Sequence, residues 1–423
     1  MSLRPLVLLL AFALPLAAQD GSPGGPIPVQ LLQARRAAVL DSMPAGVLVI
    51  ESGKIRSIEG DYPQDSDYRE NSDFFYLTGL EAPGGTLVAV QPDSSRQGGY
   101  FILYLPAPPA QADRVSAARS YADARSAALS GLTDVRAKPA RRRFRDPDPF
   151  IAVRDSIVAA HGDNSLNPRL VLGPLRQVKD TDEIRRLREA SRITARAHVE
   201  AMRQARVGMW EYQIEALLEY NFRKEGAERV GYPSIVGSGF NSTILHYDLS
   251  RRRTEPGDLV LVDAAAEFGY YSADLTRTFP IDGRFTDRQR AIYDLVLGAQ
   301  QAAIDSVRPG RTIAELNTIA RNHIRDHSGD LCAPVTCDTF FIHGLSHWVG
   351  MEVHDVGPYF VPLEPGMVFT IEPGIYIPDE SLGVRIEDVI LVTESGYENL
   401  TRDAPRAAAD IERLMAEGRG AGR

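Results

Sequence analysis

The second half of the chain repeats one arrangement of residues, and this repeat is the feature that most constrains the fold. The recurrence is weak by identity but keeps basic, small and apolar positions in order, since Arg206, Gly208, Ile214, Leu217 and Phe222 recur as Arg308, Gly310, Leu316, Ile319 and Ile324. Thr286 with Gln289 and Thr312 with Glu315 have the spacing of capping boxes, which open helices. Each copy is therefore predicted to form two helices followed by strands, and the pair to form a duplicated α+β domain with one pseudo-twofold axis.

A helix-opening signal near residue 180 separates this half from the first. Asp180 with Glu183 forms a further capping box, and apolar or small residues follow at helical spacing until Gly208. The first half is mixed. It contains strand-like runs and one stretch rich in alanine and charge that suits a helix; the runs are Gly46–Ile50, Leu87–Val90 and Tyr100–Leu105, and the stretch is Ala107–Ala140.

With 423 residues the chain is long enough for two domains with separate cores. The predicted fold class is α+β, with a smaller mixed α/β N-terminal domain ahead of the duplicated domain. The expected division is a leader peptide at 1–18, a flexible leader at 19–30, the N-terminal domain at 31–170, the duplicated domain at 175–402 and a flexible tail at 403–423.

The first eighteen residues have the layout of a secretory signal peptide. Arg4 precedes an apolar run from Leu6 to Leu16, and the small residues Ala17 and Ala18 follow. The run is too short to span a bilayer comfortably, and no cysteine lies nearby to carry a lipid. We expect an exported protein, periplasmic or secreted, without stable membrane association after cleavage.

Charge and cysteine content narrow the function further. A net charge of -9 argues against general nucleic-acid binding, which usually needs a basic surface. Cys332 and Cys337 are the two cysteines, too few for a tetrahedral zinc site. Export makes a small-loop disulfide between them plausible, and two unlinked thiols remain an equal alternative.

Two strand-like runs, Leu259–Ala266 and Tyr271–Phe279, predict a hairpin that carries two acids. A turn centred on Phe268 and Gly269 places Asp263 directly opposite Asp274. Facing carboxylates repel, and a divalent cation compensates by taking both as ligands. The alternative is two exposed acids on the wet side of the hairpin, each beside an arginine such as Arg277.

A second pair of strand-like runs, Met367–Ile377 and Gly383–Val392, carries Glu372 and Glu387 among apolar neighbours. A buried glutamate needs a partner, and Arg385 on the same strand face offers one, so an Arg–Glu structural bridge is the alternative interpretation. The pseudo-twofold axis instead brings this hairpin against the first. Four converging carboxylates then need about two divalent ions.

Histidines complete the predicted site. Three of the eight in the chain fall in the string HGLSHWVGMEVH, as His343, His347 and His354, and His246 lies just before the first hairpin. A set of four carboxylates and one imidazole is hard and oxygen-rich, which favours Mn²⁺ over a thiolate-preferring metal. Two such ions sharing a water predict hydrolysis of an amide, ester or phosphoester.

These residues, in the strings ILHY, HGLSHWVGMEVHDVG, TIEPGIYI and GVRIED, resemble the pita-bread metallopeptidases, and within them the Xaa-Pro aminopeptidases, or aminopeptidase P. The stretch DYRENSDFFYLTGLEAPGGTLVAV resembles the amino-terminal domain of that family, and the resemblance extends from about residue 31 to 400.

The resemblance implies a Mn-dependent dinuclear exopeptidase that removes the N-terminal residue from peptides with proline second, through a metal-bridging hydroxide, and that assembles as a dimer or tetramer. By motif, the ligand positions are Asp263, Asp274, His347, Glu372 and Glu387, with Asp274 and Glu387 as bridges. Glu372, His246 and His354 match catalytic positions, and the substrate-binding positions are His246, His343, His354 and Arg385.

Three features depart from that family: the export signal, the pair Phe74-Phe75 where relatives often carry a tryptophan, and the arginine-rich segment Asp248–Arg253. The nearest rival function is a prolidase, which shares the ligands but cleaves dipeptides ending in proline. A non-enzymatic binding module on the same fold is a second rival, which the complete ligand set argues against. Two further rivals are less favoured. Methionine aminopeptidase does not need a large N-terminal domain, and creatine amidinohydrolase uses the fold without metal, whereas this chain has the complete ligand set.

Overall fold

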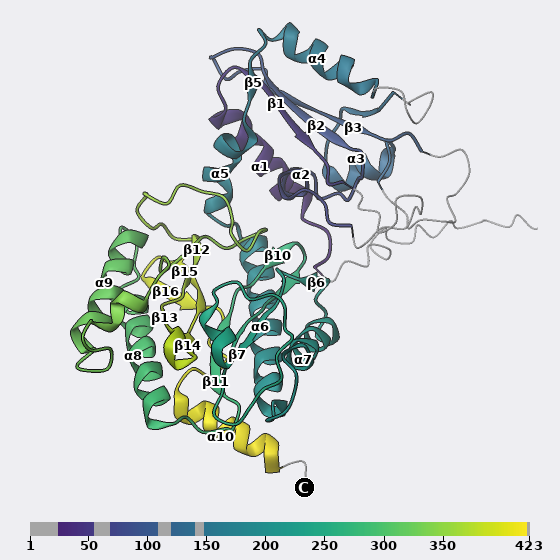
Figure 1. The fold of residues 1–423 in the computed structure, drawn as a ribbon. Coiled ribbons are helices and arrows are strands. Elements are labelled where there is room, and N and C mark those ends of the chain that lie inside the picture. The colour runs from purple at the N-terminus through teal and green to yellow at the C-terminus, as the bar shows by residue number, and fades with distance from the viewer. Residues whose placement is uncertain (1–23, 55–67, 109–119, 140–147, 421–423) are drawn as a thin grey trace, which may run out of the picture.

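The computed structural model describes residues 24–54, 68–108, 120–139 and 148–420, in two domains (Figure 1). The predicted signal peptide at 1–18 lies outside them. The upper domain in Figure 1 is built on a five-stranded sheet of order β4-β3-β2-β1-β5. Its elements are α1 (Val29–Ser42), β1 (Gly46–Glu51), α2 (Ser72–Thr78), β2 (Thr86–Gln91), β3 (Tyr100–Leu105), α3 (Ala124–Ser130), β4 (Val135–Ala137), α4 (Phe150–Ala160) and β5 (Ser165–Leu166).

Alternation along the strands gives this sheet two buried faces. In β1, Leu48 and Ile50 join the core shared with α1 and α2, whereas Val47 faces the smaller core closed by Phe150 of α4. The three predicted strand runs are thus confirmed. The helix expected over Ala107–Ala140 is wrong for the part that the structure describes, because only α3 is helical there and β4 extends the sheet beside β3.

The lower domain follows the predicted order of helix, helix and strands, twice. After the linking helix α5 (Pro168–Gln177), the first copy contains α6 (Thr181–Gln204), α7 (Glu211–Lys224), β6 (Arg229–Val230), β7 (Ile235–Ser238), η2 (Gly239–Thr243), β8 (Leu259–Asp263), β9 (Ala266–Phe268), β10 (Tyr271–Ser272) and β11 (Thr276–Pro280). The second contains α8 (Asp287–Ile304), α9 (Ile313–His327), η3 (Cys337–Phe340), β12 (Val368–Ile371), β13 (Gly374–Ile377), η4 (Pro378–Glu380), β14 (Leu382–Arg385), β15 (Asp388–Thr393) and β16 (Gly396–Asn399).

The capping boxes of α6, α8 and α9 are all present, with both reciprocal hydrogen bonds in each. The four helices lie outside the strands in Figure 1, and their apolar faces share one large core with them. The strands therefore pack against both helix pairs.

Both predicted flexible ends are ordered where the structure describes them. In the leader, Ile27 is buried and α1 begins at Val29. The tail at 403–423 forms α10 (Ala408–Gly420), which packs along α6 and buries Ile411, Leu414 and Met415. Apolar spacing at Ile411, Leu414 and Met415 supplies the physical reason, because it gives α10 one apolar face.

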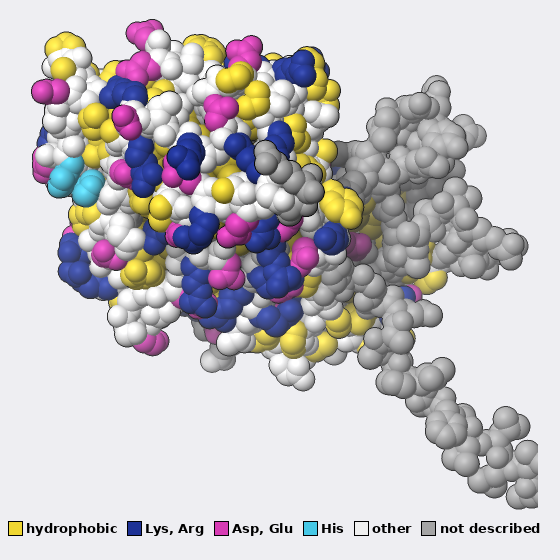
Figure 2. All heavy atoms as spheres, turned by 90° about the horizontal axis from the view of Figure 1, so that it is seen from below, with side chains coloured by type: hydrophobic (Ala, Val, Ile, Leu, Met, Phe, Trp, Pro, Cys, Tyr) yellow, Lys and Arg dark blue, Asp and Glu magenta, His cyan; other side chains and the backbone are white. Residues whose placement is uncertain are grey.

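Charge on the molecular surface is mixed. On the face seen in Figure 2, basic and acidic side chains stand side by side. Within the described part of the chain, no helix is long and apolar enough to cross a membrane.

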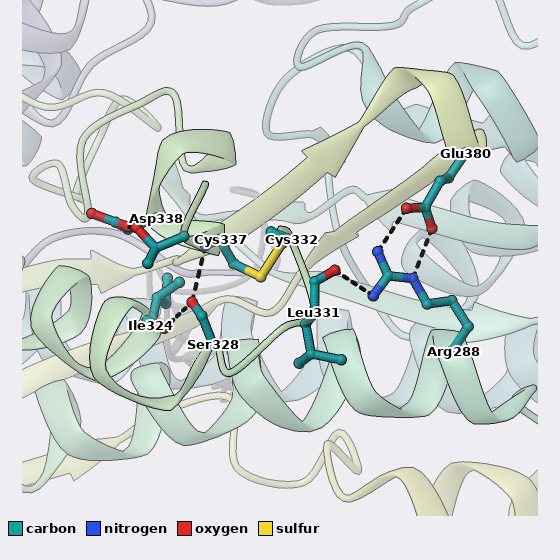
Figure 3. The surroundings of a disulfide bond; sticks show 9 residues. Arg288, Ile324, Ser328, Leu331, Cys332, Cys337, Asp338 and Glu380 are labelled. Carbon is teal, nitrogen blue, oxygen red and sulfur yellow. Dashed lines mark hydrogen bonds and ion pairs between the residues drawn. A yellow bond between two sulfur atoms is a disulfide. The ribbon is translucent and has the colours of Figure 1, made fainter. Parts of the chain in front are cut away.

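Cys332 and Cys337 form a disulfide in the connection between α9 and η3 (Figure 3). Ser328 at the end of α9 accepts a hydrogen bond from the backbone N–H of Cys337, and Arg288 of α8 donates to the carbonyl of Leu331. Arg288 also pairs with Glu380 of η4. Through Ser328 and Arg288 the disulfide-bonded loop contacts both helices of the second copy, and Arg288 in turn contacts the hairpin that carries Glu372.

Candidate active site

The first acidic hairpin keeps the predicted face but not the predicted register. Asp263 at the end of β8 lies opposite Thr276 of β11, not opposite Asp274. Asp274 comes two residues before Thr276, and a shift of two residues leaves side chains on the same face of a ladder. The two carboxylates are therefore diagonal neighbours, and the phenol oxygen of Tyr232 lies within hydrogen-bond distance of both, at 2.5 Å from Asp263 and 2.6 Å from Asp274.

The register differs because the turn lies one residue further along. Phe268 pairs with Tyr271, so the turn residues are Gly269 and Tyr270, both with positive φ of 57° and 72°. That conformation at both positions defines the two-residue turn that suits a twisted hairpin. Tyr270 tolerates it because its ring stacks on Phe75 at 3.8 Å and its hydroxyl bonds Glu81 at 2.5 Å.

Phe75 belongs to α2 of the N-terminal domain. The pair Phe74-Phe75, which departs from the resembled family, is buried, and Phe75 packs against this turn.

In the second hairpin the glutamates lie where the ladder is interrupted. The pairs Ile371 with Asp388 and Gly374 with Arg385 flank the gap, which places Glu372 across from Glu387. The two hairpins meet there, because the backbone N–H of Glu387 bonds the carbonyl of Thr276 at 3.1 Å. The convergence of four carboxylates predicted from the repeat is present.

All four acids are buried or nearly so, which contradicts the alternative of exposed acids on the wet side. Arg277 does not serve Asp263 or Asp274; it is fully buried and pairs with Asp388 at 2.8 Å. Nor does Arg385 bridge to Glu387 by a hydrogen bond. Its guanidinium bonds Asp263 at 2.5 Å, Thr276 at 3.0 Å and the hydroxyl of Tyr376 at 3.1 Å.

His347 joins the acids from the loop after η3. Its Nε2 atom lies 3.2 Å from Asp274 and 3.4 Å from Glu372. Its Nδ1 atom lies 3.1 Å from the carbonyl of Trp348, which fixes the ring plane. Asp274, His347 and Glu387 each offer one atom within 4.8 Å of the others, the arrangement of a metal-holding group.

One cavity of about 650 Å³ receives all nine residues predicted from the sequence. They are Asp263, Asp274, His347, Glu372, Glu387, His246, His343, His354 and Arg385. The ring of His354 lies 4.0 Å from that of His347, and His343 bonds the hydroxyl of Tyr376 at 2.8 Å. Apolar side chains, among them those of Pro233, Ile235 and Leu245, also line the cavity.

The charges of the site are out of balance. Burial and then neighbouring carboxylates raise the pKa of Glu387 and of Asp274 above their usual values, although His347 and Tyr232 act against this at Asp274. Burial raises the pKa of Glu372 to about 7. Burial alone would lower the pKa of His347, but Asp274 and Glu372 outweigh it and raise that pKa to about 9. A raised pKa means that the charged form of a buried carboxylate is unfavourable. Bound cations would offset that cost, so such a cluster favours metal binding.

Burial favours the neutral form of two further imidazoles, those of His343 and His354. Burial, and next the charge of Arg385, lowers the pKa of His343 to about 4. Burial, and next His347, lowers the pKa of His354 to about 4. A neutral imidazole can accept a proton or a hydrogen bond near neutral pH.

Sequence reasoning missed Tyr232, Thr276 and Tyr376. Thr276 donates to Glu387 at 2.6 Å, Tyr376 positions His343 and Arg385, and Tyr232 bridges the two aspartates. Their roles arise from contacts between the two hairpins and, for Tyr232, from the segment between β6 and β7, so local spacing does not reveal most of them. Thr276 alone had a signal, since it lies two residues after Asp274 and so on the same face.

The comparisons with known proteins agree with this geometry. Residues 185–394 match metallopeptidase family M24, and residues 32–135 match the N-terminal domain of aminopeptidase P. The chain is 35% identical to the Xaa-Pro aminopeptidase of Escherichia coli, over 92% of this chain and 98% of that one. It is 39% identical to the Xaa-Pro dipeptidase of Pyrococcus furiosus, but over only 55% of this chain and 65% of that protein.

Among solved structures, aminopeptidase P from E. coli with the inhibitor Pro-Leu matches with a TM-score of 0.82 at 33% identity, covering 94% of this chain and 100% of that one. The two-domain architecture expected from the sequence is thus confirmed. The chain belongs to metallopeptidase family M24, and within it to the aminopeptidase P group.

Proposed function

We propose that the protein is a metal-dependent Xaa-Pro aminopeptidase, which hydrolyses the bond between the N-terminal residue of a peptide and a proline in second place. The observation that carries this function is the convergence of four buried carboxylates and His347 on one cavity, in a chain that matches Xaa-Pro aminopeptidases over both domains.

The donor set fits two divalent ions. Asp263, Asp274, His347, Glu372 and Glu387 would hold them, with Asp274 and Glu387 between the two ions. Oxygen donors and one imidazole suit Mn²⁺, which is the metal we propose. When bound, such a pair supplies an activated water and polarises the scissile carbonyl.

The residues around the ion site would handle protons and substrate. Glu372, which lines the cavity beside His347, would pass a proton from the attacking water to the leaving prolyl nitrogen. His246 and His354 line the cavity and can donate to oxygen as negative charge develops there. His343 and Arg385, joined through Tyr376, are placed to hold the carbonyl and carboxyl groups of the peptide.

The apolar side chains of Pro233, Ile235 and Leu245 in the cavity lining suit a prolyl ring in second place. A solved relative, aminopeptidase P from E. coli, binds the proline-containing inhibitor Pro-Leu, which supports a prolyl site in this family. A prolidase is disfavoured because the dipeptidase relative matches only about half of the chain, whereas the aminopeptidase relative matches both domains.

Substrate length decides between the two activities. We expect turnover of Gly-Pro-Gly in the presence of Mn²⁺ and none, or far less, of Gly-Pro. Release of glycine from each peptide, followed by chromatography, measures both. Turnover of the dipeptide alone would make the protein a prolidase. A correctly folded protein that binds no Mn²⁺ and cleaves neither peptide would instead be a binding module.

We further propose export to the periplasm or medium and assembly into a dimer or tetramer. The disulfide between Cys332 and Cys337 supports export, because such bonds persist in oxidising compartments. Accurate mass of the protein isolated from its host would show removal of residues 1–18, and light scattering would give the subunit number.

A further inference from the structure

The loop that carries His354 has no helix or strand of its own. It runs from Val349 to Leu363, and it passes directly beneath α5 as the yellow-green segment in Figure 1. His354 is exposed at its middle. The position of this imidazole in the cavity must therefore come from contacts that the loop makes with other elements.

The residue after His354 is fixed by a buried ion cluster. Asp355 pairs with Arg176 of α5 through one carboxylate oxygen and with Lys179 through the other, at 2.8 Å for the lysine. All three side chains are almost fully buried. Burial alone would raise the pKa of Asp355, but Lys179 and Arg176 outweigh it and lower the pKa below its usual value. A buried pair of this kind defines a position, and losing one partner leaves an uncompensated charge.

The same cluster reaches into the N-terminal domain. Arg176 also pairs with Asp73, in the first turn of α2, at 2.6 Å. Just before α2, Arg69 donates to the carbonyl of Met351 and pairs with Glu267 of β9 at 2.7 Å. Met351 and Asp355 stand on either side of His354, so the N-terminal domain holds this part of the loop from both sides.

The backbone of the loop is closely packed against these contacts. A Cβ atom on Gly350 would lie 2.0 Å from the Asp355 carboxylate, so the backbone at Gly350 lies flat on the ion pair. The carbonyl of Gly350 accepts from Ser272 of β10 at 2.9 Å, and the backbone N–H of Asp355 bonds Trp348 at 2.9 Å. A shift of the Asp355 carboxylate would thus move the whole turn that presents His354.

We infer that the N-terminal domain positions His354 for the reaction, through Asp73, Arg176 and Asp355 on one side and through Arg69 on the other. Asp73, Arg176, Asp355 and Arg69 are positioning residues and touch no substrate. This inference rests on the proposed peptidase activity for its kinetic consequence, but its structural consequence can be measured without activity.

The kinetic test is a double-mutant cycle with the full-length Mn²⁺ protein. We expect Arg176→Met to lower kcat/KM for Gly-Pro-Gly by about tenfold or more, because small displacements of a catalytic group carry losses of this order. In a His354→Ala background the same change should have less than about a twofold further effect, since the two act through one imidazole. Losses that multiply in the double variant, or an unchanged rate for Arg176→Met, would overturn the inference.

The second measurement is hydrogen exchange of peptides covering the loop. Arg176→Met should speed exchange across Gly350–Tyr359, and Asp73→Asn, at the partly exposed end of the chain of ion pairs, should do so more weakly. Arg35→Met is the matched control, because Arg35 forms a buried ion pair with Asp180 between the domains and contacts no residue of the loop.

Equal exchange of the loop in Arg176→Met and Arg35→Met would overturn the inference whether or not the protein is a peptidase. Absence of hydrolysis by the unaltered protein would overturn the proposed function alone. If Arg176→Met does not fold, both measurements are made on Asp73→Asn.

Discussion

At the scale of single residues, the site depends on hydrogen bonds that orient the predicted ligands. Tyr232 is the clearest case, because its one hydroxyl lies within hydrogen-bond distance of both Asp263 and Asp274 and so orients the two carboxylates. Groups that orient a ligand in this way affect metal affinity by about tenfold to a hundredfold.

Tyr232→Phe should therefore weaken Mn²⁺ binding by about tenfold or more while leaving the fold intact. Isothermal titration of the metal-free protein measures the change. Tyr247→Phe is the control, since it also removes a tyrosine hydrogen bond to a carboxylate, that of Glu211 at 2.8 Å, away from the acids. Equal weakening in both variants would contradict the role given to Tyr232.

A buried histidine behind the first hairpin makes stability depend on pH. His198 bonds the carbonyl of Ala264 at 2.8 Å, and burial lowers its pKa to about 4. The unfolded chain takes up this proton at a pKa of about 6.5, so His198 stabilises the fold above that pH and the contribution is lost as pH falls toward 4. Between pH 7.5 and pH 5 the loss is about 2 kcal/mol.

Urea unfolding of the protein at those two pH values measures the loss, and His198→Gln should remove about 2 kcal/mol of the difference. The glutamine keeps a donor for the Ala264 carbonyl but does not titrate. A variant with the same pH dependence as the unaltered protein would assign the effect to other groups.

At the scale of elements, the strands and their faces were predictable, and their exact pairing was not. Strand-like runs located β1, β2 and β3, and the position of the turn put Asp263 and Asp274 on one face of their hairpin. The register of the first hairpin depended on Tyr270 adopting a positive φ, which Phe75 and Glu81 from another domain stabilise. Contacts between residues so far apart in the sequence produce no local sequence pattern. For the same reason the contact of Tyr232 with the predicted metal ligands could not be predicted.

The disulfide belongs to this scale too, because it closes the short connection between α9 and η3. For a loop of this length the chain-entropy estimate gives about 2 kcal/mol of stabilisation. Changing Cys332 and Cys337 together to serine should lower the free energy of unfolding by that amount, measured in urea, with kcat/KM changed less than about twofold. Reductant should destabilise the unaltered protein and leave the double variant unaffected; an equal response of both would contradict this.

At the scale of the whole molecule, both ends of the chain brace the catalytic domain. The N-terminal domain holds the first hairpin through Arg69 and the His354 loop through Asp73 and Arg176. The C-terminal helix α10 lies along α6, which carries the core behind the hairpins. Composition predicted neither contact. A polar and charged segment such as 403–410 is expected to be exposed unless the neighbouring element that covers its helical face is known.

Removing α10 should therefore destabilise the protein by about 5 kcal/mol, since Ile411, Leu414 and Met415 would no longer be buried. Thermal unfolding of a chain ending at Ala407 measures this. A chain ending at Gly420, which loses only the last three residues, is the control. Equal midpoints for the two truncated chains would contradict a stabilising role of α10.

The central claim is that Asp263, Asp274, His347, Glu372 and Glu387 hold the metal ions that make this chain a peptidase. The most direct test is kcat/KM for Gly-Pro-Gly while Mn²⁺ is returned to chelated protein, with Asp263→Ala and His347→Ala measured alongside. The site predicts that turnover rises to its limit at two Mn²⁺ per chain and falls at least about a thousandfold in either variant, which stays folded. Turnover that needs no metal, or that persists in either variant, would contradict it.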